Sequence, residues 1–299
     1  MAVDAQWDDV VVMAPLTADL LDARGNQVSE GPGATGLSSA VGNAFGAGDA
    51  YHFAGGTGFS SDFVSYLLPT YTYHGTGDFC VQLAFYPEDG GHGSASDSIL
   101  FQTYVSGDTG SIRIISNGSA NPMNLRVEHH NGSTWVDLID FVATGISDDA
   151  WHWLQLDMAS GIASCYVDGA LYSDETRTVD LQFESIFIGD GFNGYIHDVR
   201  FTVGSYRASH SVPGAPWLRP TIEGTVTTAP KNRVVASLNR GTLTVDASTV
   251  ADVTTGVYTL FPYDYNEHVV LWFDTDTYPL VDGGSGEQAE IYDRVSPGG

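Results

Sequence analysis

Two acidic and amide clusters beside turns have side chains that could hold a calcium ion. Asp190 and Asn193 lie among three glycines in "GDGFNG" (189–194), and Asp148 and Asp149 precede "AWHWLQLDM". Calcium takes six to eight oxygen ligands from carboxylates and carbonyls, so these residues are candidate ligands. Glycine and asparagine are also what a tight turn needs, and no dense acidic loop surrounds them. We interpret the corner as a turn, with calcium as the one candidate cofactor and no metal predicted.

Catalytic patterns are missing from the sequence. His129 and His130 are adjacent in the strand-like "NLRVEHH", so they point to opposite faces and cannot readily share one ion. A glycosidase needs two carboxylates that converge on the scissile bond, and the strand signature Glu-x-Asp-x-x-Glu is absent. Neither a G-x-S-x-G elbow nor an H-E-x-x-H helix occurs. We therefore predict no catalytic residues and no enzyme.

Aromatic residues near predicted turns are candidates for contact with sugars. Trp135 follows the turn "NGS" (131–133), while Tyr71, Tyr73 and His74 precede the strand-like "DFCVQLAFYP". An aromatic ring at a loop can serve as a flat platform for a ligand or as packing for the core. The sequence leaves both interpretations open, so no ligand-binding residue is assigned.

Charge is the strongest compositional signal. The chain has 11 basic and 37 acidic residues, a net charge of −26, and Lys231 as its only lysine. A surface this negative repels phosphate backbones and anionic lipids, so we predict no nucleic-acid partner. No apolar run approaches the ~20 residues of a membrane span, so we predict no membrane insertion.

The N-terminal sequence and the cysteines indicate where the protein is made. "MAVDAQWDDVVV" lacks the basic and apolar regions of a secretion signal, so we expect folding in a cytoplasm. Cys80 and Cys165 both fall in strand-like runs. In that compartment we expect small buried thiols and no disulfide.

Period-two alternation dominates the chain and predicts an all-β fold. In "DFCVQLAFYP", Phe79, Val81, Leu83 and Phe85 share one face. The same rule places Tyr195, His197, Val199, Phe201 and Val203 on one face of "YIHDVRFTV". Turn signals such as Asn131-Gly132, Ser160-Gly161 and Asp168-Gly169 separate the predicted strands. Many short strands of this kind are typical of a β-sandwich.

A proline-rich stretch divides the chain into two predicted domains. "SHSVPGAPWLRP" (209–220) has three prolines and reads as a linker. We predict a larger domain over residues 1–217 and a smaller β-sandwich over residues 218–299, which acts as a docking or spacer domain. Residues before Arg219 include 26 acids and 6 bases, a net charge of −20, so the acidic surface belongs to the larger domain.

The larger domain resembles the laminin-G-like family, which has a concanavalin-A-like jelly-roll fold. Four segments carry the resemblance in family order: "GTGDFCVQLAFYP", "DDAWHWLQLDM", "CYVDGALY" and "IFIGDGFNGYIHDVRFTVGSYR". The opening "WDDVVVMAPLTADLLDARG" is similar to versions found in bacteriophage genomes. The resemblance implies that Trp151 opens a core strand and that Gly194 bends the chain into the final strand. The sequence departs from the family pattern at His197, where an acidic residue is usual. We expect a packed, hydrogen-bonded core histidine there instead of a ligand.

The smaller domain resembles carboxypeptidase-regulatory-like β-sandwiches at the ends of bacteriophage tail and virion proteins. The matching positions are Gly224 to Val226, Arg233-Val234, Thr255 to Tyr258, His268 to Asp274, and Asp293 to Pro297. The resemblance implies a bacteriophage virion structural protein, a tail, fibre or head-decoration component made in the host cytoplasm. Its expected partners are other virion proteins, further copies of itself, and host surface glycans bound through many weak contacts. The alternative is a bacterial carbohydrate-binding module or a glycosidase-associated lectin-like protein.

Overall fold

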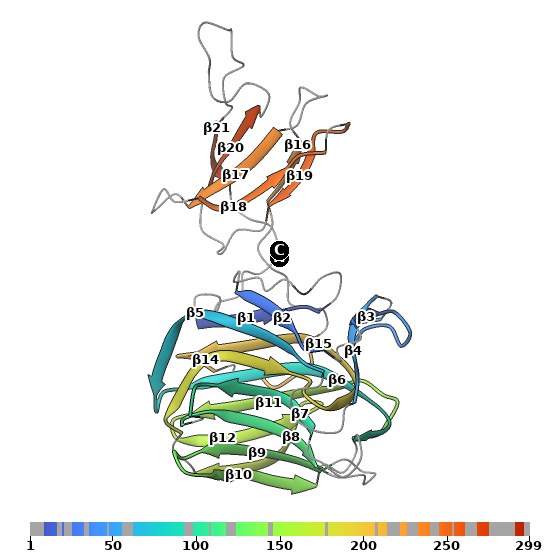
Figure 1. Ribbon diagram of the computed structural model, residues 1–299, viewed down its shortest axis with the longest axis vertical. Helices are drawn as coiled ribbons and strands as arrows, with labels where there is room; N and C mark the ends of the chain where they lie inside the picture. The colour runs from blue at the N-terminus through green and yellow to red at the C-terminus, as the bar shows by residue number, and fades with distance from the viewer. Residues whose placement is uncertain are drawn as a thin grey trace, which may run out of the picture. The chain divides into compact units, whose positions relative to one another are not determined.

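The computed structural model describes two compact units, one comprising residues 9–217 and one containing residues 218–299. Figure 1 shows the strands of each unit. The described residues are 9–16, 20, 26–32, 36–46, 48–55, 62–92, 98–107, 109–117, 124–142, 146–176, 179–206, 209–213, 222–225, 233–239, 245–252, 254–260, 268–274 and 291–295.

Two antiparallel sheets form the larger unit (Figure 1). In the first sheet the order is β13-β12-β11-β6-β15-β4-β3, and β1 pairs with β15. Its strands are β1 (Val10–Ala14), β3 (Gly36–Ser38), β4 (Ala50–Ala54), β6 (Phe79–His92), β11 (His152–Ala159), β12 (Ile162–Val167), β13 (Ala170–Thr176) and β15 (Phe192–Val203).

The second sheet has the order β10-β9-β8-β7-β14-β5-β2. Its strands are β2 (Gln27–Glu30), β5 (Val64–Gly75), β7 (Ser98–Tyr104), β8 (Ile112–Asn117), β9 (Asn124–His130), β10 (Trp135–Val142) and β14 (Leu181–Ile188). Strands that neighbour each other in a sheet but not in sequence, such as β6 and β15, give the jelly-roll connectivity. The predicted all-β jelly-roll sandwich is confirmed.

Apolar side chains from both sheets meet in one core. Phe79, Val81, Leu83 and Phe85 of β6 all belong to it, as their alternation predicts. Leu125 and Val127 of β9 contribute from the opposite sheet. Because side chains alternate across a strand, residues between these core positions face outward. This alternation gives each sheet an outer face that carries polar side chains.

The predicted tight turns are present at the predicted positions. Asp168 and Gly169, with φ of 53° and 79°, join β12 to β13 with Val167 paired to Ala170. Two consecutive positive φ values match the strand twist in a two-residue hairpin. Asn131 begins the β9–β10 turn, where its amide nitrogen donates to the Thr134 carbonyl. The Asn131 Oδ1 atom accepts from the backbone of Ser133 and Thr134, which fixes this turn.

The predicted direction of the side chains is wrong in the first half of β15. Ile196, Val199 and Phe201 lie in the core, whereas His197 points away from it. The cause is a β-bulge between His197 and Arg200, where Asp198 has a φ of 55°. An extra residue in one strand moves the side chains beyond it to the opposite face of the sheet. Thus Phe201 and Val199 follow the predicted face, and His197 does not.

Trp151 also departs from its expected place. It precedes β11, and its ring makes edge contacts with Tyr86 and His197 instead of joining the core. Gly194 lies inside β15, two residues after the strand begins, with a φ of 144° at a register shift in the pairing with β6. A Cβ atom there would lie 2.1 Å from the Tyr86 carbonyl oxygen, so only glycine fits.

The smaller unit is a second, smaller β-sandwich. One sheet pairs β16 (Ile222–Thr225) with β19 (Val257–Leu260). The other has the order β18 (Val245–Val250), β17 (Arg233–Asn239), β20 (His268–Asp274), β21 (Ile291–Val295). A small core of Ile222, Val235, Ala251, Leu260 and Val270 draws on both sheets.

Candidate functional site

A polar network crosses the outer face of three neighbouring strands, β8, β9 and β10. Glu128 of β9 lies opposite Arg113 of β8 and Asp137 of β10. Arg126 precedes Glu128 by two residues, so both point to the same side of β9. Their neighbours Leu125 and Val127 are buried in the core, which fixes these polar side chains on the outer face.

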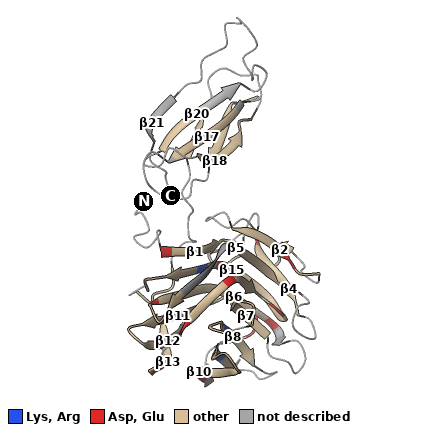
Figure 2. Cartoon of the chain, turned by 60° about the vertical axis from the view of Figure 1, so that its left-hand side comes forward, with Lys and Arg blue, Asp and Glu red and all other residues tan. Residues whose placement is uncertain are grey.

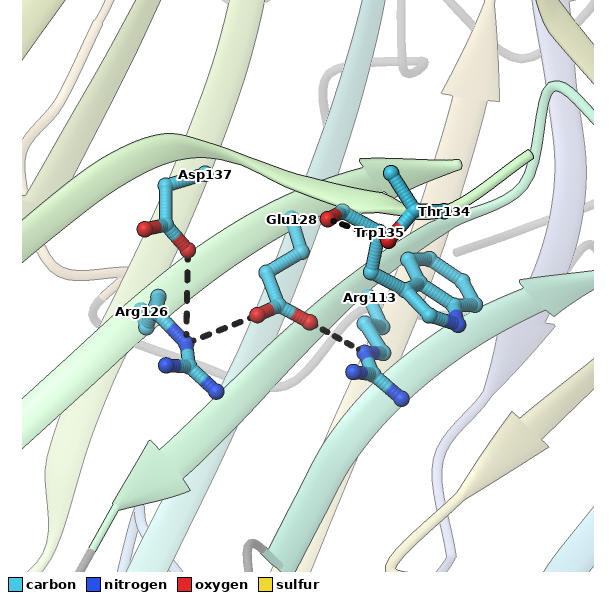
Figure 3. A network of polar contacts seen from close by, with 6 residues as sticks. All are labelled: Arg113, Arg126, Glu128, Thr134, Trp135 and Asp137. Carbon is cyan, nitrogen blue, oxygen red and sulfur yellow. Dashed lines mark hydrogen bonds and ion pairs between the residues drawn. The ribbon is translucent and has the colours of Figure 1, made fainter. Parts of the chain in front are cut away.

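The Glu128 carboxylate joins the two arginines (Figure 3). Its Oε2 atom accepts a hydrogen bond from Arg113 Nε, and its Oε1 atom lies 2.9 Å from Arg126 Nε. Asp137 Oδ1 lies 3.6 Å from the same Arg126 Nε. In Figure 3 the terminal nitrogens of both guanidinium groups point away from Glu128, toward one side of the network.

An aromatic ring completes this network. Trp135 is the first residue of β10, and the Arg113 guanidinium carbon lies 4.1 Å from its ring centroid. The His130 ring meets the same indole edge to face, with centroids 5.2 Å apart. A guanidinium over an indole face is attracted by the ring quadrupole, so the arginine and the tryptophan hold each other in place. We call Arg113, Arg126, Glu128, Trp135 and Asp137 the Glu128 network.

Burial within the network is graded. The Glu128 side chain is 6% exposed, the two arginines 14% and 22%, and Asp137 56%. A buried carboxylate between two guanidinium groups has its charge compensated, which the interior requires. The arginines are accessible enough for a ligand to reach their donors, while the carboxylate beneath them fixes their orientation. The arrangement presents rigid polar groups at a surface.

The network is also unusual in its charge. Two of the six basic residues that precede Arg219 meet here, in a segment with 26 acids. Figure 2 shows the described acidic residues spread over several strands of the larger unit. The network is thus a local concentration of donors on an acidic domain.

Sequence reasoning singled out Trp135 but missed both arginines and Glu128. The signal that could have found them is the alternation itself. "SIRIIS", "NLRVEHH" and "TWVDLIDF" each place a charged residue at an outward position. Consecutive strands joined by short turns lie side by side, so these outward charges meet.

Of the calcium candidates, Asp148, Asp149 and Asp190 lie in turns, whereas Asn193 lies within β15. Asp190 is buried in the corner between β14 and β15, and its carbonyl accepts a hydrogen bond from the Ile99 amide. Asn193 packs against Gly55, and the amide of Asp149 bonds the Pro87 carbonyl. Within the described ranges, no three His, Cys, Asp or Glu side chains come together as a metal would need. Calcium binding stays an untested hypothesis.

The other candidates fall in different places. His74 Nε2 lies 3.1 Å from the Asp78 carbonyl oxygen, so this ring holds a turn. The side chains of Tyr71 and Tyr73 lie outside the described part of the structure. His129 is half-buried, and burial lowers its pKa. Cys80 and Cys165 are buried free thiols, as expected.

His197 has an environment that the sequence did not reveal. The side chain is fully buried, with its ring between Phe45 and Trp151 at centroid distances of 5.5 and 6.1 Å. Neither ring nitrogen has a hydrogen-bond partner among the described residues. Burial without a compensating partner disfavours the charged imidazolium and lowers the pKa of His197 to about 4.

Comparison with solved structures finds similar folds at low sequence identity. The binding domain of botulinum neurotoxin serotype D is similar with a TM-score of 0.50 and 9% identity, over 98% of this chain and 81% of that chain. The likeness is one of fold. No protein-family model and no curated protein sequence matches this chain.

Carbohydrate-binding domains are also among the similar structures. Domain 4 of the arabinanase AbnA from Geobacillus stearothermophilus has a TM-score of 0.46 and 16% identity, over 66% of this chain and 93% of its own. The carbohydrate-binding module CBM66 from Bacillus subtilis has a TM-score of 0.38 and 12% identity, over 59% of this chain and 96% of its own. In the part of the chain that the structure describes, no helix is long and apolar enough to cross a membrane.

Proposed function

We propose that the larger unit is a non-catalytic glycan-binding domain and that the Glu128 network is its binding site. The observation that carries the proposal is the Glu128 carboxylate, which holds two partly exposed guanidinium groups in fixed positions. A saccharide offers pairs of neighbouring hydroxyl groups, which fit the planar, forked donors of arginine and the acceptors of Asp137. Side chains that are fixed before binding lose little entropy when a ligand arrives.

The Trp135 indole supports the same interpretation. Arg113 lies over the ring, so the aromatic surface and the donors belong to one continuous patch. Sugar rings have an apolar face and a polar edge, and a site for them combines an aromatic ring with a few fixed polar groups. The botulinum neurotoxin domain of similar fold is a binding domain, but the proposal rests on the residues of this chain.

Glycan-array binding of the full-length protein tests the proposal, followed by calorimetry on the glycans that score. We expect Trp135→Ala to weaken binding about tenfold, because an aromatic contact contributes roughly 1 kcal/mol beyond area burial. Val136→Ala, next along β10 and 40% exposed, is the matched control and should leave affinity unchanged. Equal affinity for Trp135→Ala and wild type, or an array without signal for the multimerised protein, would refute the proposal.

The virion role predicted from the sequence stays a prediction. A glycan-binding domain fits either setting, a particle that meets a host surface or a bacterial protein that meets polysaccharide. Mass spectrometry of purified particles would detect the protein in the first setting and not in the second. Multivalent display in either setting would compensate for weak single-site affinity.

A further inference from the structure

The outer face of the other sheet carries a ladder of polar side chains. Gln82 Nε2 of β6 donates to Gln155 Oε1 of β11 at 2.8 Å, and Gln155 Nε2 donates to Asp157 Oδ2 at 2.8 Å. Asp157 is nearly fully buried, and burial raises the pKa of its carboxyl. A carboxylate at such a position is costly unless it has a partner. The ladder therefore holds an acceptor in a fixed orientation at this face.

That partner comes from the segment after β15. His210 Nε2 lies 3.1 Å from Asp157 Oδ2, and the His210 ring stacks on Tyr166 of β12. The two ring centroids are 3.7 Å apart and the planes differ by 10°. This is the one parallel stack found among the described ring pairs, where all others are tilted or edge-on. The His210 ring thus covers one face of Tyr166, and its Nε2 edge contacts the Asp157 carboxylate.

The contact lies at the surface. His210 is 29% exposed and the Asp157 side chain 3%, so the imidazole lies between the buried carboxylate and the solvent as one of its contacts. The segment passes close over the β12–β13 turn, where a Cβ on Gly169 would lie 3.1 Å from the His210 carbonyl oxygen. Displacement of this ring would uncover the Tyr166 face that it stacks on and remove one hydrogen-bond partner of Asp157 Oδ2.

One carboxylate oxygen of the site can accept further hydrogen bonds. The Cys80 thiol hydrogen-bonds the Asp157 carboxyl, but the buried Oδ1 atom itself has no hydrogen-bond partner among the described residues. A carboxylate oxygen can accept two hydrogen bonds, so the site can take a ligand richer in donors than imidazole. A ring with an apolar face and several hydroxyl groups at its edge meets this description.

We propose that Tyr166 and Asp157 form a second saccharide subsite, which His210 occupies as an intramolecular ligand. The ligand class is a neutral pyranose, whose apolar face would replace the imidazole on Tyr166 and whose hydroxyls would donate to Asp157. His210 and the glycan compete for one place, so binding releases the segment around His210. This subsite lies on the sheet opposite the Glu128 network and does not depend on the function proposed for it.

The test compares full-length wild type with His210→Ala on an array of neutral hexose oligosaccharides. The variant removes the competitor, so we expect its affinity for at least one neutral glycan to rise about tenfold or more. The rise should disappear in His210→Ala/Tyr166→Ala, which lacks the platform. His210→Phe is the matched control, because it keeps a flat ring over Tyr166 and should show no gain.

The outcomes separate this subsite from a plain structural tether. A tether predicts that His210→Ala lowers the melting temperature without any gain in glycan binding, and that result would overturn the proposal. A gain that survives the loss of Tyr166 would overturn it as well. Glu128→Ala should leave the gain in place, so failure of one site is distinguishable from failure of the other.

Discussion

Replacement of Glu128 by alanine is expected to weaken glycan binding at the Glu128 network by about 100-fold or more. Glu128 bonds Arg113 and pairs with Arg126, so its loss removes a carboxylate that holds both guanidinium groups. Two like charges then remain close together at 14% and 22% exposure. The two guanidinium groups repel each other, so the ligand must fix their orientation when it binds. Calorimetric titration of the best array glycan measures the loss.

The same substitution should also lower the free energy of unfolding. Breaking an ion pair by removal of one partner leaves an uncompensated charge, which costs about 2 kcal/mol where the remaining partners are partly exposed. Asp137→Asn is the matched control, because this carboxylate is 56% exposed and 3.6 Å from Arg126. It should change stability by less than about 0.5 kcal/mol. Equal unfolding midpoints in urea for Glu128→Ala and Asp137→Asn would contradict the role of Glu128.

Acid is expected to destabilise the protein through His197 by about 3 kcal/mol between about pH 7 and pH 4. Burial holds the pKa of His197 in the fold at about 4, against 6.5 in the unfolded chain. Below pH 6.5 the unfolded chain binds a proton that the fold does not. As far as His197 is concerned, the protein therefore keeps its full free energy of unfolding above about pH 6.5. Part of that free energy is lost as the pH falls toward 4, because protonation of His197 favours the unfolded chain.

His197→Phe isolates this effect from the titration of the many carboxylates. Phenylalanine keeps a ring between Phe45 and Trp151 and removes both unpartnered nitrogens. We expect the variant to be at least as stable as wild type at neutral pH, because a buried polar group without a partner costs about 1 to 3 kcal/mol. Urea unfolding at several pH values should show the two curves diverging as the pH falls. Parallel curves would exclude His197 as the source.

Most of the larger fold could be predicted from the sequence because its signals are local. Alternation along β6 assigns Phe79 and Leu83 to the core, and Asp168-Gly169 marks a hairpin that needs positive φ values. Both features depend only on residues within one strand or turn. Side-chain alternation and turn-forming residues depend on only a few neighbouring positions, so both can be recognised without knowledge of the rest of the chain.

The Glu128 network was only partly predictable. Trp135 was a candidate because it follows a turn signal, but the sequence offered packing and binding as equal alternatives. The decisive contact joins Trp135 to Arg113 of β8, across the β9 strand that separates them in the sheet order. Which outward residues meet depends on the register of three strands, including the shift between Asp137 and Ile139. Register is a property of the assembled sheet.

The sequence by itself determined the class of the fold, the hairpin turns and the strongly acidic character of the chain. Tertiary structure alone decided where His197 points. The Asp198 amide donates to the carbonyl of Pro15 at 3.0 Å, and this bond accompanies the bulge that turns His197 away from the core. Pro15 follows β1, far from β15 in the chain. Side-chain alternation depends on residues two positions apart in one strand. A bulge is stabilised by the neighbouring strand, and only the folded sheet places that strand beside it.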